Sequence, residues 1–115
     1  MNKICLNLSI LFIICFSFCY QVFAAEVLQV SSPSILLIGD NNRTYVVKIA
    51  CADVNPDLEE KSLYWLKKQL PRHTKVNLKP KGLNDGVLEA RVITIDTNID
   101  ITDKYISEGF AENKC

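Results

Sequence analysis

The stretch "VVKIACADVNPDLEE", residues 46–60, is where an apolar segment gives way to an acidic one, and the other elements of the chain are arranged around it. Its first half predicts a buried strand, because alternate side chains are apolar or aromatic and fall on one face. The residues on that face are Tyr45, Val47, Ile49 and Cys51. Lys48 then points to the opposite face. Asp53 follows the strand directly, so it could be a metal ligand, half of a catalytic pair, or part of a turn into a helix.

The second half of the same stretch predicts the clearest helix of the chain. Asp57 is a suitable N-cap, Pro56 precedes it, and Glu60 stands at the position of a capping-box partner. Leucines at helical spacing follow and predict the buried face. They are Leu58, Leu63, Leu66 and Leu70. Pro71 ends the helix, and Trp65, beside the leucines, is expected in the core or at its edge.

Segments on both sides of the stretch predict further β-strands. Before it, a Gly-Asp-Asn-Asn turn joins two strands in a hairpin, since these residues tolerate a positive φ. After the helix, the turn "KGLNDG" separates two more strands. The five predicted strands are residues 26–30, 34–40, 43–51, 74–80 and 87–96. A short final helix is expected, capped by Asp100 or Thr102 and stopped by Gly109.

This order of elements predicts the fold class. Three strands, a helix, two strands and a short C-terminal helix suit a small five-stranded β-barrel of the OB type. In such a barrel closure removes the sheet edges, and a helix covers one end. An open α+β sheet is the alternative. Residues 25–115 would form a single domain, because a chain of this size buries only one small core.

The first 24 residues predict an export signal rather than part of the fold. Lys3 gives a short positive start, an uncharged apolar run follows, and the residues before the predicted cleavage site after Ala24 are small or apolar. A retained anchor is the alternative, because the run is nearly long enough to span a bilayer. Cleavage predicts an exported protein (periplasmic, lumenal or secreted) with no membrane-spanning segment in the mature chain.

Two of the five cysteines remain after cleavage, Cys51 and Cys115. In an exported chain two cysteines can pair. The alternative is two free thiols, one in the core and one on a loose tail.

Positive charge is concentrated in one run, although the net charge of the chain is zero. Residues 67–81, which we call the basic run, hold no acid and six basic side chains: Lys67, Lys68, Arg72, Lys75, Lys79 and Lys81. They are the candidate binding residues for an anionic partner, such as nucleic acid or an acidic exported protein. The alternative is a solvated helix end followed by an alternating strand. No aromatic residue is interleaved with the lysines to stack on bases, and the single histidine, His73, is expected at the surface.

From Thr44 onward the chain resembles the staphylococcal nuclease-like (thermonuclease-like) family. The segment "VKIACADVNP" is similar to the family's strand that leads to D-x-P-E, and "EEKSLYWLKKQLPRHTKVNLKP" is similar to the helix and strand that follow. Likewise "DGVLEARV" resembles Y-G-R-x-L-A-x-V, and "IDITDKYISEGFAE" resembles the family's last segment, which ends in G-L-A. The resemblance implies an OB-type barrel and, for the family, calcium-dependent cleavage of phosphodiester bonds.

The family's reaction implies a set of site residues that this chain has largely replaced. It uses two carboxylates on calcium, a glutamate that activates water and two arginines that hold the charged transition state. Asp53 matches the second carboxylate, whereas the uncharged loop Ser31–Ser34 stands in place of the first. Lys48 falls on the first arginine and Val87 on the second.

The glutamate that would activate water is missing from its expected position as well. Pro56 occupies it, because "DVNPD" carries one extra residue, and Asp57 is the adjacent candidate base. Glu59 and Glu60 are read as the solvated first turn of a helix. Arg91 lies about 13 Å along the strand from Val87, too far to replace an arginine there.

These substitutions predict a nuclease scaffold without nuclease activity and without a cofactor. We therefore expect an exported, non-catalytic binding or accessory module for nucleic acid or another partner. The alternative is a calcium-dependent phosphodiesterase with a rearranged site, in which Asp53 would be a metal ligand. A third hypothesis is a structural subunit that docks on a larger exported complex.

Overall fold

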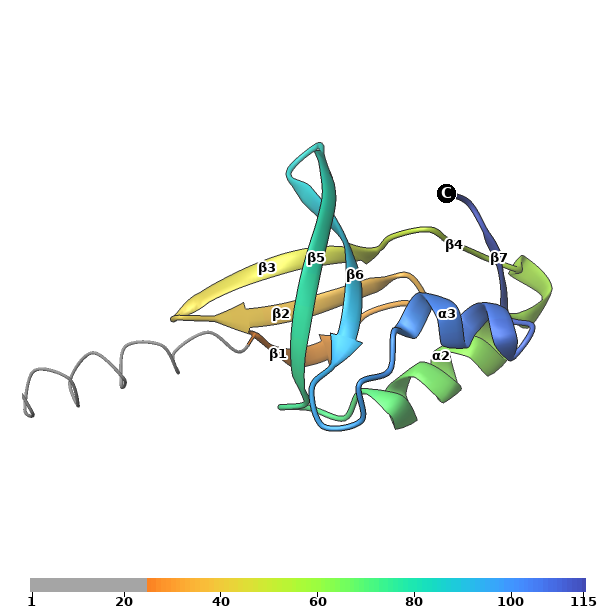
Figure 1. Ribbon diagram of the computed structural model, residues 1–115, viewed down its shortest axis with the longest axis horizontal. Coiled ribbons are helices and arrows are strands. Elements are labelled where there is room, and N and C mark those ends of the chain that lie inside the picture. Colours follow the sequence, from red (N-terminus) through yellow and green to blue (C-terminus); the bar gives the residue numbers. More distant parts are fainter. Residues whose placement is uncertain (1–24) are drawn as a thin grey trace, which may run out of the picture.

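The computed structural model describes residues 25–115, which form a barrel with two helices packed at one end (Figure 1). The predicted export signal, residues 1–24, lies outside the described residues. Within residues 25–115, no helix has both the length and the apolar composition needed to cross a membrane.

Five strands close into the barrel in the order β1-β2-β3-β6-β5. They are β1 (Ala25–Val30), β2 (Ile35–Asp40), β3 (Arg43–Ile49), β5 (Lys75–Asn84) and β6 (Val87–Thr94). All neighbours are antiparallel except β3 and β6, which run parallel. The prediction of a small OB-like barrel is confirmed, and the open sheet is excluded.

Two hairpins extend from the barrel (Figure 1). In the β2–β3 turn Asn41 and Asn42 have φ of 49° and 65°, as expected for residues that tolerate the left-handed region. The β5–β6 turn is shorter than predicted and consists of Asp85 and Gly86, with φ of 52° and 79°. Residues 81–84, predicted as part of a turn, instead continue β5, because pairing with β6 carries the strand past a register shift between Pro80 and Gly82.

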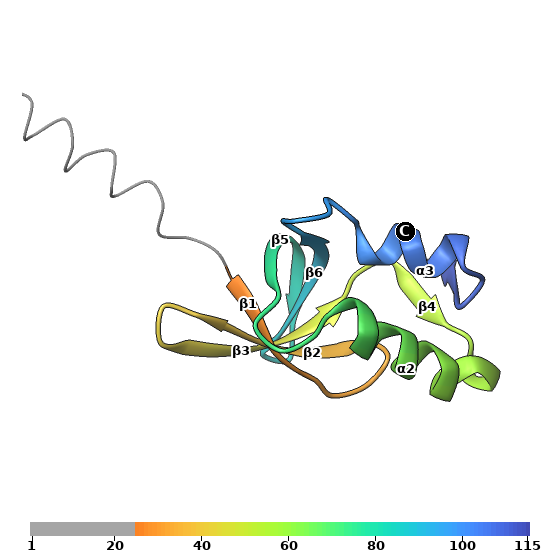
Figure 2. The same cartoon turned by 90° about the horizontal axis from the view of Figure 1, so that it is seen from below.

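The core consists mainly of side chains of the barrel strands, and it extends to the helices that cover one end of the barrel (Figure 2). Helix α2 (Glu59–Gln69) lies between β3 and β5 in the sequence, and α3 (Ile101–Ser107) follows β6. The predicted leucine face of α2 is confirmed by Leu66, which is fully buried. Trp65 packs at the core edge as predicted, with its ring centroid 5.1 Å from that of Tyr105 and 5.7 Å from that of Phe110.

The start of α2 differs from the prediction. Asp57 does not cap it; instead Asn55 Oδ1 accepts a hydrogen bond of 3.0 Å from the Asp57 amide and caps a 3-10 turn, η1 (Pro56–Leu58). Helix α2 then begins at Glu59 without a side-chain cap. Asn55 and not Asp57 is the capping residue because Asn55 directly precedes Pro56, and the fixed φ of proline suits the first turn of a helix.

The start of α3 follows the prediction. Asp100 Oδ1 accepts a hydrogen bond of 2.9 Å from the Thr102 amide, and Gly109, with φ of 81°, lies just after the helix. The Thr102 hydroxyl donates to the Ala50 carbonyl over 2.6 Å. This bond ties the helix to the end of β3.

Two short strands that were not predicted form a second, two-stranded sheet. They are β4 (Ala52–Val54) and β7 (Ala111–Asn113). The predicted third strand was expected to run through Cys51; β3 instead ends at Ile49, and Cys51 has a φ of 67°. Cys51 and Cys115 form a disulfide, with 5.0 Å between their Cα atoms; of the two alternatives that the sequence left open, the structure shows pairing.

Tyr105 is expected to make the fold sensitive to alkaline pH. It is fully buried, its hydroxyl donates to the Pro33 carbonyl over 2.7 Å, and burial raises its pKa well above that of a free tyrosine. An unfolded tyrosine ionises near pH 10. Above that pH, Tyr105 ionises in the unfolded chain but stays protonated in the folded protein. Ionisation lowers the free energy of the unfolded state alone, so the folded state becomes less stable.

The folded state should therefore lose at most about 1.4 kcal/mol per pH unit from this group once the pH exceeds about 10. Urea titrations at pH 9, 10 and 11 would measure the loss. Tyr105→Phe removes the titrating group, so it should show a shallower loss over the same range. An equal loss of stability in the variant would show that Tyr105 is not the source of the alkaline sensitivity.

Candidate functional site

One pocket gathers most of the positions that the family resemblance singled out. It has a volume of about 270 Å³ and lies between the β1–β2 loop, β3, β4 and the start of α2. Its charged and polar lining residues are Ser32, Ser34, Lys48, Asp53, Asn55, Glu59 and Lys114. We call it the loop–helix pocket.

The serine loop of this pocket is shaped by its own hydrogen bonds. Ser32 Oγ accepts bonds of 3.2 and 3.0 Å from the amides of Ser34 and Ile35. The loop thus turns tightly, and it brings no carboxylate to the place where the resemblance would put the first calcium ligand.

Lys48 points outward from β3 into the pocket rim, as the alternation predicted. Its ammonium lies 3.9 Å from Glu89 Oε1, a contact across the parallel pairing of β3 with β6. Both side chains are well exposed, so this ion pair adds little to stability. A lysine presents a point charge rather than the two-pronged donor that an arginine would offer to a phosphate.

Asp53 lies on β4, and its nearest charged partner comes from the end of the chain. Lys114 Nζ is 3.8 Å from Asp53 Oδ2, and the aspartate side chain is 55% exposed. Glu59 is the other carboxylate of this pocket. These two are the residues that could contribute to a calcium site, although calcium takes about six to eight oxygen ligands. Across residues 25–115, no three His, Cys, Asp or Glu side chains gather as a metal site.

Val87 and Asp57, the remaining family-matched positions, do not line this pocket. Val87 begins β6 opposite Asn84, in the hairpin that extends from the barrel. Pro56, which stands at the position of the base, and Glu59 both line the pocket, whereas Asp57 does not.

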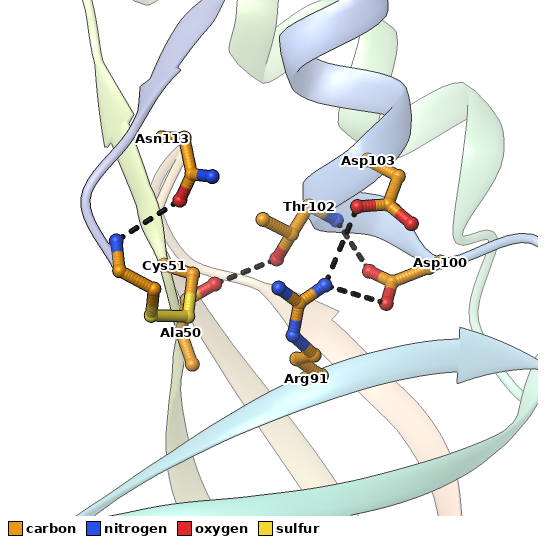
Figure 3. A network of polar contacts seen from close by, with 8 residues as sticks. Ala50, Cys51, Arg91, Asp100, Thr102, Asp103 and Asn113 are labelled. Atoms are coloured by element: carbon orange, nitrogen blue, oxygen red, sulfur yellow. Dashed lines mark hydrogen bonds and ion pairs between the residues drawn. A yellow bond between two sulfur atoms is a disulfide. The ribbon is translucent and has the colours of Figure 1, made fainter.

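Arg91 cannot replace the missing arginine, because it already holds α3 to the barrel (Figure 3). Its guanidinium donates to Asp100 over 2.9 Å and to Asp103 over 3.3 Å. The hydrogen bond to Asp100 is the main reason that the pKa of Arg91 is raised, and Asp103 adds to it.

The basic run lies on a different part of the surface. All six of its lysine and arginine side chains are exposed. Lys75 donates to Glu26 over 3.1 Å, and this bond, together with one from His73, lowers the pKa of that glutamate. His73 is exposed, as predicted. Within the described part of the chain, the other five basic side chains of the run form no ion pair.

The second half of the basic run has a structural explanation. Strand β5 pairs with β1 only at Val76 and Lys75, so within residues 25–115 its edge from Asn77 onward has no strand beside it. Lysine, proline and a bulge are common devices that prevent an exposed edge from pairing with another chain. Lys79, Pro80 and the register shift beside them fit this role.

The first half of the basic run lies at the C-terminal end of α2 and just after it. Lys67 and Lys68 occupy the last turn of the helix, and Arg72 follows it. We call these three residues, together with Tyr64, the helix-end surface.

Tyr64 was missed in the sequence because it lies outside the run of lysines. Its side chain is 64% exposed, and Lys68 Nζ lies 4.6 Å from the centre of its ring. The spacing of four residues places the two on one face of a helix, and that signal could have revealed the pair. An exposed aromatic beside cations is the usual arrangement for stacking on an unpaired base.

The comparisons with known proteins add no relative. No family model matches the chain, and no curated protein matches it.

Proposed function

We propose that residues 25–115 are an exported, nuclease-like barrel that binds single-stranded nucleic acid at the helix-end surface without cleaving it. One observation carries this proposal: exposed Tyr64 lies beside Lys68, and the cations at this end of α2 form no ion pair within residues 25–115. Cations that track phosphates and an aromatic ring that stacks on a base together form a minimal binding site for a single strand.

Three features support the absence of cleavage. Lys48 stands where the first arginine would be, Val87 where the second would be, and the serine loop where the first carboxylate would be. Loss of a single oxyanion-type donor costs on the order of 10² to 10³ in rate. Several such losses in one site leave little of the family's activity.

The disulfide supports the export part of the proposal. A bond between Cys51 and Cys115 persists in an oxidising compartment and favours a non-cytoplasmic setting. The predicted signal peptide, with cleavage after Ala24, would deliver the chain there.

The helix-end cations are expected to carry the salt-sensitive part of binding. Replacing Lys67, Lys68 and Arg72 together with glutamine should weaken binding to a fluorescent single-stranded oligonucleotide. It should also reduce the slope of log K against log salt by about 2, since each phosphate contact on a single strand contributes about 0.7. Fluorescence anisotropy between 50 and 200 mM salt would measure both quantities.

A matched control removes the same number of charges elsewhere. Arg43, Lys104 and Lys114, none of which belongs to α2, are replaced by glutamine, so the helix-end surface keeps all of its side chains. Equal loss of affinity in the two triple variants would mean that binding follows net charge, and the proposed site would be wrong. Tyr64→Ala should weaken binding at every salt concentration without changing the slope, because stacking releases no counterions.

A calcium-dependent phosphodiesterase remains the second candidate, favoured by one observation. Lys48, Asp53 and Glu59 line a single pocket although they belong to three different elements, β3, β4 and α2. This candidate predicts cleavage that requires calcium and disappears in Asp53→Ala. A protein that neither cleaves nor binds nucleic acid would instead fit the docking subunit on a larger exported complex.

A further inference from the structure

The last five residues of the chain form a strap at the edge of the loop–helix pocket. We call residues 111–115 the C-terminal strap. It contains β7, which pairs with β4, and it contributes Lys114 to the lining of the pocket. Figure 3 shows Asn113 of the strap near the disulfide of Cys51. The Cys115 amide donates to Asn113 Oδ1 over 2.9 Å.

The non-covalent contacts of the strap are few. The Lys114 amide donates to the Cys51 carbonyl over 3.0 Å, and the sheet of β4 and β7 is only three residues long. The ion pair of Lys114 with Asp53, at 3.8 Å, joins two exposed side chains and so adds little. A two-stranded sheet is marginal in water even when it is longer. Ala111 is buried, but the residues after it are exposed. Asp53 and Glu112 lie opposite each other in this sheet. Repulsion between the two carboxylates opposes the pairing of β4 with β7.

The disulfide is therefore the main attachment of the strap beyond Ala111. It is also accessible, because Cys115 is exposed while Cys51 is partly buried. A thiolate needs access to one sulfur to begin exchange.

We propose that the Cys51–Cys115 bond is a reversible redox site that controls the C-terminal strap and, through it, the loop–helix pocket. In the reductive step a thiolate of a dithiol attacks Cys115 Sγ, the S–S bond breaks, and Cys51 leaves as a thiolate. The second thiol of the dithiol then displaces Cys115 and closes the dithiol's own disulfide. Two electrons pass to the cysteine pair, and the two protons of the dithiol end on the two cysteine thiols.

Reduction frees residues 112–115 and withdraws Lys114 from the pocket. With the strap in place, two lysines and two carboxylates line the pocket: Lys48, Lys114, Asp53 and Glu59. Without it one lysine remains, so the formal charge of the lining changes from zero to one negative. The opened pocket is wider and favours cationic groups, whereas the closed pocket is balanced. This inference does not depend on the helix-end surface, which lies elsewhere.

Nuclear magnetic resonance relaxation of the oxidised protein and of the protein in dithiothreitol tests the proposal. In the oxidised form, backbone order parameters of residues 112–115 should be near those of the barrel, about 0.85. In dithiothreitol they should fall below about 0.6, while those of β6 stay unchanged. Removal of the reductant and reoxidation should restore the first pattern.

The variant with both Cys51→Ser and Cys115→Ser is the matched control. It should show the reduced pattern with or without dithiothreitol, which links the effect to this bond. A strap that stays ordered after reduction would overturn the proposal. If the reduced barrel unfolds, the measurement is repeated in trimethylamine oxide, which favours the compact state; loss of order in β6 together with the strap under that condition would also overturn it.

Discussion

Replacing Cys51 and Cys115 together with serine is expected to lower the free energy of unfolding by about 4 kcal/mol. The two cysteines are separated by 64 residues in the sequence, so their bond restricts most of the unfolded chain. In the chain-entropy account this restriction, rather than contacts in the folded state, is the main source of stability. A domain of this size has a small margin, so the effect would be a large part of its total stability.

Urea titrations of the oxidised protein and of the double serine variant would measure this change. The midpoint should fall strongly in the variant. Adding dithiothreitol should bring the wild-type midpoint to that of the variant while leaving the variant itself unchanged. Equal midpoints for the oxidised protein and the variant would show that the bond adds no stability.

Replacing Tyr105 with alanine is expected to cost about 3 to 5 kcal/mol, the range for removing a large buried aromatic side chain. Tyr105 is fully buried at the junction of the helices and the barrel, and its ring contacts those of Trp65 and Phe110. Its hydroxyl also donates to the Pro33 carbonyl. The substitution would remove the aromatic cluster's centre and leave that carbonyl without its partner.

Two further variants separate these contributions. Tyr105→Phe keeps the ring and removes the hydrogen bond, so we expect a smaller loss of about 1 to 2 kcal/mol. Tyr64→Ala changes an exposed tyrosine and should alter the stability by less than about 0.5 kcal/mol. Thermal unfolding followed by Trp65 fluorescence would report all three, and a loss in Tyr64→Ala as large as in Tyr105→Ala would contradict this description of the core.

Local sequence patterns predicted the barrel because most of its strands bury alternate residues. The apolar face of β3 and the Asn-Asn turn before it were both visible in the sequence. The length of β5 was not visible, since residues 81–84 contain the Gly and Asn typical of a turn. Their pairing with β6 is a tertiary contact that overrides this local preference.

The start of α2 could not be predicted from the sequence for a different reason. Asn55 and Asp57 are both good capping residues, two positions apart, and the sequence alone does not rank them. Strands β4 and β7 are three residues long, too short for any alternation to be recognised. Their pairing depends on contacts between segments about 60 residues apart, which no local pattern records.

The candidate site was predictable in the same uneven way. The family resemblance implied that Lys48, Asp53 and the serine loop belong together, and the structure places them around one pocket. Lys114 was not expected there, because only the folding back of the C-terminal strap brings it beside Asp53. Tyr64 lies outside residues 67–81, and only the helical spacing of four residues relates it to Lys68.

The most direct test of the central claim is a combined cleavage and binding assay on the oxidised wild-type protein. A fluorescent single-stranded oligonucleotide is incubated with it in calcium or in a chelator, anisotropy reports binding, and gel electrophoresis reports cleavage. We predict binding that weakens as salt increases and no cleavage beyond that in buffer under either condition. Calcium-dependent cleavage that disappears in Asp53→Ala, or the absence of any binding, would contradict the account.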